Sequence, residues 1–159
     1  MEINVLIEEG FGEYLEEDWL QSVAERVLIA QGVSSEAELG LVIASQERIQ
    51  QLNRDYLGRD RPTDVIAFPL LPESSVGGDL LPFVPPPDGV SHLGEVIISY
   101  PQAVAQAEEQ GHSIKKEITI LIIHGTLHLL GYEDEKPGLK RQMRAREKEI
   151  LSCIEGEKG

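Results

Sequence analysis

The chain lacks several features that would place it in other protein classes. Its 159 residues include one cysteine, Cys153, so no disulfide bond can form within the chain. No apolar run approaches the roughly 18 residues that a membrane-spanning helix needs. The N-terminus also lacks the basic start and long apolar stretch of a signal peptide. We therefore expect a soluble, cytoplasmic protein that does not contact a membrane.

Positive charge is scarce overall and concentrated locally. The chain has 14 Lys+Arg against 28 Asp+Glu, a formal net charge of −14, which argues against a nonspecific polyanion binder. A small basic group lies at Arg54, Arg59 and Arg61, and residues 136–148 hold six cations against one acid, Glu147. The six are Lys136, Lys140, Arg141, Arg144, Arg146 and Lys148. Charge alone favours a solvated helix surface here, with a local positive face that steers an anion as the alternative.

The composition is that of an ordinary globular protein, and we expect a single domain over residues 1–159. Hydrophobic residues make up 41% and charged residues 26% of the chain, which excludes wholesale disorder. Alternation and helical spacing predict four strands and five helices. The strands are expected at 2–7, 39–44, 65–68 and 95–99, and the helices at 15–31, 45–57, 101–111, 113–130 and 138–154. These elements predict an α+β domain, with a small mixed sheet packed against the helices and a buried central helix.

One stretch fits neither a helix nor a central strand. Residues 69–92 contain six prolines, including the run Pro85-Pro86-Pro87. The stretch is predicted to be a long surface loop, and loops of this length are usually functional lids or mobile insertions.

The central helix carries two histidines, His124 and His128, whose i, i+4 spacing places both imidazoles on one face. Such a pair could be a satisfied core pair or two ligands of one metal ion. Gly131 and the carboxylates at 133–135 follow, and a turn there could supply a third ligand. Two histidines with one further ligand leave an open position for water, as a catalytic zinc site requires. Because two unpartnered imidazoles on a buried helix are costly, this continuation favours the metal site.

The spacing also matches the extended zincin pattern H-E-x-x-H-x-x-G-x-x-H, with Gly131 at the position of its glycine. However, Gly125 stands where a zincin peptidase carries its general-base glutamate. A zincin-like metallopeptidase is therefore the weaker interpretation.

Four blocks of the sequence resemble the YbeY family of bacterial ribosomal-RNA maturation endoribonucleases. HGTLHLLGYED is similar to the family signature H-G-x-L-H-L-x-G-Y-D-H. LNRDYLGRDRPTDVIAFP, LGEVIIS and GHSIKKEITILIIHG resemble further family blocks, in the family's order over about residues 40–151. The resemblance implies a zinc-dependent, single-strand-specific endoribonuclease that acts in small-subunit ribosomal RNA 3′-end maturation and ribosome quality control.

The resemblance also implies a metal site, with one zinc ion per chain held by His124, His128 and Asp134. The family's third histidine falls on Asp134, and a carboxylate is a competent zinc ligand. The anionic ligand should reduce the metal's pull on its bound water and relax its selectivity toward harder ions. If the turn differs, Glu133 or Glu135 could replace Asp134.

A second departure concerns phosphate binding. The family's arginine after the tyrosine falls on Leu57, so its role would pass to Arg59 or Arg61 or be lost. In the resulting mechanism, Arg59 and Arg61 stabilise negative charge on the phosphate, and zinc activates water or polarises a phosphate oxygen. His112 is expected either near the pocket or beside the helix cap at Ser113.

The implied partners are ribosomal RNA and the small ribosomal subunit, with a ribosomal protein or an assembly GTPase as a further candidate. The chain has three Phe, one Trp and four Tyr, too few for extensive base stacking, so a partner would supply targeting. The alternative is a noncatalytic ribosome-assembly factor with a structural metal, which Leu57 and Asp134 both favour.

Overall fold

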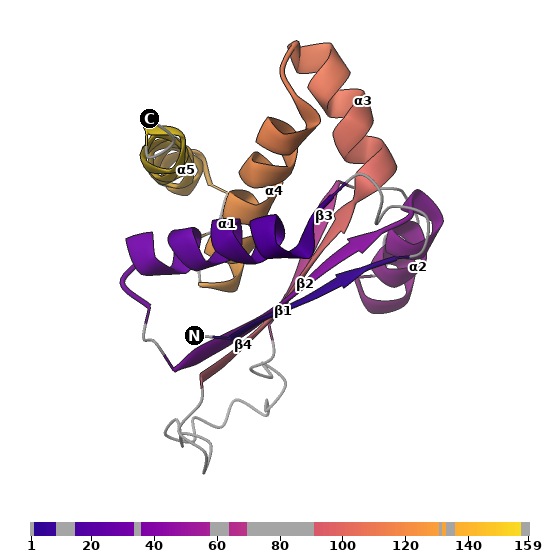
Figure 1. Ribbon diagram of the computed structural model, residues 1–159, viewed down its shortest axis with the longest axis horizontal. Coiled ribbons are helices and arrows are strands. Elements are labelled where there is room, and N and C mark those ends of the chain that lie inside the picture. The colour runs from indigo at the N-terminus through magenta and orange to yellow at the C-terminus, as the bar shows by residue number, and fades with distance from the viewer. Residues whose placement is uncertain are drawn as a thin grey trace.

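The structure is a computed structural model that describes residues 2–8, 15–33, 36–57, 64–69, 91–130, 132 and 136–156. The strands are β1 (Glu2–Ile7), β2 (Ala37–Ala44), β3 (Val65–Pro69) and β4 (Ser91–Ser99). The helices are α1 (Glu17–Ala30), α2 (Gln46–Leu57), α3 (Tyr100–Gln110), α4 (Ile114–Leu129) and α5 (Pro137–Gly156). Four strands and five helices in the described ranges confirm the predicted α+β class (Figure 1).

The strands form one mixed sheet in the order β1-β2-β4-β3. β1, β2 and β4 are parallel, and β3 runs antiparallel to β4 at one edge. Leu41 of β2 pairs with Val5 of β1 and Val96 of β4, while Ala67 of β3 pairs with Val96 from the other side. Pro69, which cannot donate to a ladder, lies in the edge strand β3, as expected for proline.

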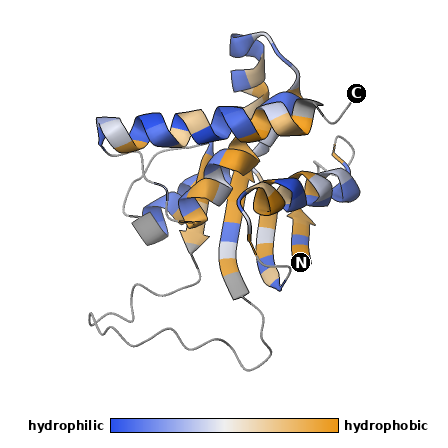
Figure 2. Cartoon of the chain, turned by 90° about the vertical axis from the view of Figure 1, so that its left-hand side faces the viewer, coloured by the Kyte–Doolittle hydropathy of each residue, from blue (hydrophilic) through white to orange (hydrophobic). Residues whose placement is uncertain are grey.

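The two faces of the sheet bury different sets of side chains because successive residues of a strand point in opposite directions. On one face, Val96 and Ile98 join the main core with residues of α1, α4 and α5. On the other face, Ile66 and Ile97 form a smaller cluster with Ile49 of α2. Figure 2 shows hydrophobic residues along the strands and mostly hydrophilic residues on the outer sides of the helices. The helix with the histidines is therefore on the more thickly covered face.

Helix α4 is buried along most of its length, as predicted. Ser113 caps its start, and the Ser113 hydroxyl accepts a hydrogen bond from the Lys116 amide at 3.1 Å. Gly125 is the point of closest packing on the sheet. A Cβ at this position would lie 2.6 Å from Val96 Cγ1 and 3.1 Å from Val65 Cγ2. Glycine is thus required here for α4 to pack directly on β4 and β3.

Other predicted helix ends are also observed. Ser45 accepts from the Arg48 amide at the start of α2. Helix α3, predicted to start at residue 101, starts at Tyr100, and Ser99 caps it by accepting from the Gln102 amide. Gly111 ends α3 with a φ of 70°, a conformation that glycine adopts at little cost. None of the helices in the described ranges is long and apolar enough to cross a membrane.

The predicted loop over residues 69–92 needs correction at both ends. Pro69 is the last residue of β3, where it pairs with Gly94. Ser91 and His92 are the first residues of β4, which starts four residues before the predicted strand at 95–99. The extension follows from pairing with β2, whose residues Ala37 and Glu38 pair with Ser91 and His92. Residues 70–90 lie outside the described part of the chain.

Candidate metal centre

The last two turns of α4 bring His124 and His128 together. Their Nε2 atoms lie 3.1 Å apart, and the rings meet edge to face with centroids 4.6 Å apart. Both side chains are partly exposed to solvent. The predicted i, i+4 pair thus points two imidazole nitrogens at one place near the surface.

Each ring is held through its other nitrogen. His124 Nδ1 lies 2.5 Å from Glu147 Oε2 of α5, and His128 Nδ1 lies 3.1 Å from the backbone oxygen of Tyr132. A carboxylate and a carbonyl only accept hydrogen bonds, so each Nδ1 carries the proton in these contacts. The two acceptors therefore fix both the orientation and the tautomer of the rings.

This arrangement leaves a lone pair on each Nε2 when the rings are neutral. Two lone pairs that face each other at 3.1 Å repel unless a proton or a cation lies between them or beside both. Histidines that bind metals have their other ring N–H bonded in this way, to a carboxylate, a backbone carbonyl or a water. His124 and His128 fit two nitrogen ligands of a metal ion, and zinc accepts such a set when one further ligand completes it.

The rest of the expected ligand set comes from residues 133–135. Asp134 and its alternatives Glu133 and Glu135 lie outside the described residues. Among the residues that are described, no group of three His, Cys, Asp or Glu side chains is arranged to hold a metal. Asp134 as the third ligand remains a prediction.

The expected phosphate-binding residues, Arg59 and Arg61, also lie outside the described residues, between α2 and β3. The strand that follows them begins next to the centre, because Val65 is one of the two valines that contact Gly125. His124 is the neighbour of Gly125 on α4.

Position 125 also bears on peptidase chemistry. The residue after the first histidine faces Val96 and Val65 of the sheet at contact distance. A glutamate there would have to displace both valine side chains before it could approach the histidines. The packing of α4 therefore disfavours a glutamate at the position of the zincin general base, where the sequence has glycine.

His112 belongs to a separate cluster at the start of α4. Its Nε2 lies 2.6 Å from Glu117 Oε1, and Glu117 Oε2 accepts from Gln106 Nε2 at 2.7 Å. Glu117 is only 5% exposed. It precedes His124 by seven residues, about 10 Å along the helix axis. The cluster ties α3 to α4, and His112 is not part of the histidine pair.

Glu147 contacts the histidine pair but was not predicted from the sequence. It is far from His124 in the chain, and only the packing of α5 on α4 brings the two together. A signal was nevertheless present. Glu147 lies in line with Met143, Ile150 and Ile154, which form the buried stripe of α5. A single carboxylate in such a stripe, within an otherwise basic segment, indicates a specific buried partner.

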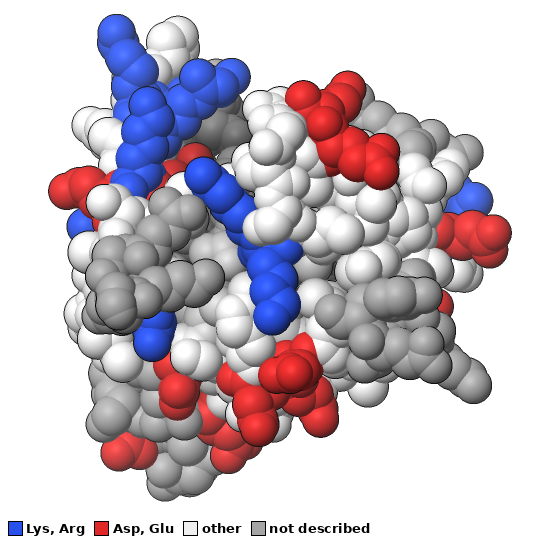
Figure 3. All heavy atoms as spheres, turned by 45° about the horizontal axis from the view of Figure 1, so that its top comes forward, with Lys and Arg blue, Asp and Glu red and all other residues white. Residues whose placement is uncertain are grey.

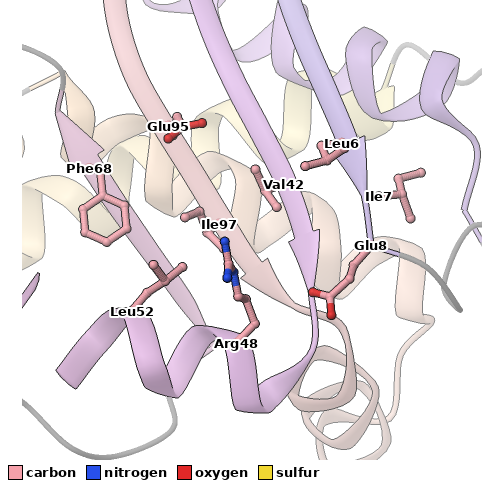
Figure 4. A pocket seen from close by; sticks show the side chains of 9 residues that line it. All are labelled: Leu6, Ile7, Glu8, Val42, Arg48, Leu52, Phe68, Glu95 and Ile97. Carbon is pink, nitrogen blue, oxygen red and sulfur yellow. The ribbon is translucent and has the colours of Figure 1, made fainter. Parts of the chain in front are cut away.

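A groove of about 710 Å³ lies on the opposite face of the sheet from the histidine pair. Figure 4 shows its lining, with Val42, Ile97 and Phe68 from the strands, and Leu52 and Arg48 from α2. These side chains belong to or border the cluster on the α2 side. The sheet thus separates this groove from the histidine pair, so the groove is not part of the candidate metal centre.

Comparison with known proteins agrees with the motifs. Residues 8–155 match the family model described as Endoribonuclease YbeY. A protein of that name from Dehalococcoides mccartyi is 44% identical over 148 residues, covering 91% of each chain. Another, from Roseiflexus sp., is 37% identical over 153 residues, covering 96% of this chain and 92% of its own.

Among solved structures, the solution structure of TM1509 from Thermotoga maritima is similar. The TM-score is 0.62 at 26% sequence identity, covering 98% of this chain and 90% of that one. The family model and the relatives extend over nearly the whole chain, and the histidine pair lies within the matched range. The chain therefore belongs to the YbeY family.

Proposed function

We propose that the protein is a metal-dependent endoribonuclease that cuts single-stranded RNA. Its substrate is ribosomal RNA of the small subunit, and its roles are 3′-end maturation and ribosome quality control in the cytoplasm. The relatives named Endoribonuclease YbeY support the class of activity. The observation that carries the proposal is the pair of convergent Nε2 atoms, each ring held by an acceptor at Nδ1.

Zinc is the metal that this donor set favours, with His124, His128 and Asp134 as its ligands and one ion per chain. When bound, zinc supplies a Lewis acid and lowers the pKa of its water to about 7. Glu147 holds the proton on His124 Nδ1, and the Tyr132 carbonyl does the same for His128. Both contacts hold the Nε2 atoms on the same side of α4, 3.1 Å apart.

Arg59 and Arg61 are proposed to hold the phosphate that is cut. A guanidinium presents two parallel N–H groups to phosphate oxygens and stabilises the negative charge that develops on them. Their segment leads into β3, whose first residue contacts Gly125 beside His124.

A cleavage assay tests the activity. Purified protein is incubated with a labelled single-stranded RNA from the 3′ end of small-subunit ribosomal RNA, and with the same RNA in a duplex. We expect cleavage of the single strand only, and its loss in His124→Ala. Absence of cleavage with the metal present would instead support the alternative of a noncatalytic ribosome-assembly factor.

A zincin-like peptidase remains the weaker candidate because the sheet occupies the space for its glutamate. The small ribosomal subunit is the expected partner in either of the other two roles, together with a ribosomal protein or an assembly GTPase.

A further inference from the structure

The surface of α5 is divided lengthwise. Met143, Ile150 and Ile154 are buried against the core, and Glu147 lies beside them. Successive residues of a helix are rotated by about 100°, so the exposed residues of α5 fall on two sides of this buried stripe. One side carries a stripe of basic residues and the other side does not. The basic stripe consists of four exposed residues, Lys140, Arg141, Arg144 and Lys148. The opposite side carries Gln142, Ala145, Glu149 and Cys153, all exposed.

The basic stripe lies on the same side of α5 as Glu147. Arg144 precedes Glu147 by three residues and is its neighbour on the helix surface, and Lys140 lies on the same face two turns earlier. Because Glu147 contacts His124, this edge of α5 borders the histidine pair. From Lys140 to Lys148 the stripe spans about 12 Å of helix, enough to follow several groups of an extended strand.

The stripe is not explained by internal ion pairing. Within the described part of the chain, its four residues make no ion pair, whereas Arg146 lies 3.7 Å from Glu149 and bonds the end of α1 through Ala30 and Gln31. Nor does solubility account for it, because cations lower the magnitude of a net charge of −14. Figure 3 shows Lys and Arg gathered on the side of the molecule where α5 lies in Figure 1.

We propose that the basic stripe of α5 binds the phosphate backbone of single-stranded RNA and leads the strand to the histidine pair. The inference rests on the proposed function, because it assigns the surface that holds the substrate of that site. Lysine and arginine side chains bind phosphates without reading bases, which suits a protein with few aromatic residues for stacking.

The test compares two triple variants with equal loss of charge. Lys140→Gln/Arg144→Gln/Lys148→Gln removes three of the four charges of the stripe, and Arg26→Gln/Arg48→Gln/Lys115→Gln removes three charges elsewhere. Both change the net charge from −14 to −17. Glutamine is a good helix former, so helix α5 should be retained, which circular dichroism checks. RNA binding is measured by fluorescence anisotropy with a labelled oligouridylate of about 12 nucleotides, in EDTA to prevent cleavage.

We expect the stripe variant to bind roughly 10- to 100-fold more weakly than the parent at about 0.1 M salt. The slope of the logarithm of its RNA association constant against the logarithm of salt concentration should be shallower by about 2. This value is for three lost phosphate contacts at about 0.7 each. The control variant should stay close to the parent. Equal weakening of both variants, no weakening of either, or a parent that does not bind RNA would each overturn the inference.

Cleavage by the parent is measured in parallel, with metal present. If the parent binds RNA through the stripe but does not cleave it, the proposed activity is contradicted and the binding role of the stripe is supported. If the parent cleaves RNA and the two triple variants bind RNA equally well, the proposed activity is supported and the binding role of the stripe is contradicted.

Discussion

Glu147 Oε2 of α5 lies 2.5 Å from His124 Nδ1 of α4, and this contact sets the direction of the ring. His124 is thereby oriented by a residue on another helix, whereas His128 is oriented by the turn that directly follows its own helix. The two Nε2 atoms converge because both contacts are made. The packing of α5 on α4 therefore takes part in building the centre.

Removal of Glu147 should weaken metal binding. Loss of such a partner typically costs 10- to 100-fold in metal affinity, because the ring then adopts other orientations and tautomers. We expect this loss of zinc affinity in Glu147→Ala and a smaller loss in Glu147→Gln, whose amide oxygen can still accept from Nδ1. Competition with a chromogenic chelator measures the affinity. Glu149→Gln, on the other side of α5, is the matched control, and parental affinity in Glu147→Ala would contradict the role of Glu147.

Gly125→Ala should destabilise the fold. The added Cβ would lie 2.6 Å from Val96 Cγ1, well inside contact distance, so either the Val96 side chain or helix α4 must shift. Overpacking of this kind costs about 1–3 kcal/mol, and urea denaturation measures it.

Two comparisons sharpen this prediction. Gly138→Ala, where nothing lies within 4 Å of the new Cβ, should be neutral or stabilising. Val96→Ala combined with Gly125→Ala should cost less than the two single changes added together, since the smaller side chain makes room. A parental denaturation midpoint in Gly125→Ala would show that the close packing is wrong.

The cluster around Glu117 should support the fold and not the metal. Glu117→Ala leaves Gln106 and His112 without their shared acceptor in a place that is only 5% exposed. We expect a loss of about 1–3 kcal/mol in unfolding free energy, with unchanged zinc affinity. Glu108→Ala, on the exposed side of α3, serves as the control. A loss of zinc binding in Glu117→Ala, with the fold intact, would place this cluster in the metal site after all.

The parts of the centre that depend on local spacing could be predicted from the sequence. The i, i+4 distance between His124 and His128 is a property of one helix, and the cap at Ser113 and the stop at Gly111 are likewise local. Glu147 could not be paired with His124 in the same way, because their contact depends on how α5 packs on α4. From the sequence, Gly125 indicated only that the general-base glutamate of a zincin peptidase is missing. Its positive role, close packing on Val96, required the sheet.

The start of β4 shows the same limit for the fold. Ser91 and His92 follow a proline-rich stretch and have no strong strand pattern of their own. They join the sheet because they pair with Ala37 and Glu38 of β2, which lie more than 50 positions away in the chain. Pairing between distant segments decides such boundaries, and a local pattern does not contain it.

The metal content of the purified protein tests the central claim most directly. Protein prepared without chelator or affinity tag is analysed by elemental analysis, beside His128→Ala, Asp134→Ala, and His112→Ala as the histidine control. The account predicts about one zinc per chain in the parent and in His112→Ala, and loss of zinc in the other two. A parent without metal, or full zinc content in His128→Ala, would contradict the assignment of the histidine pair as a metal centre.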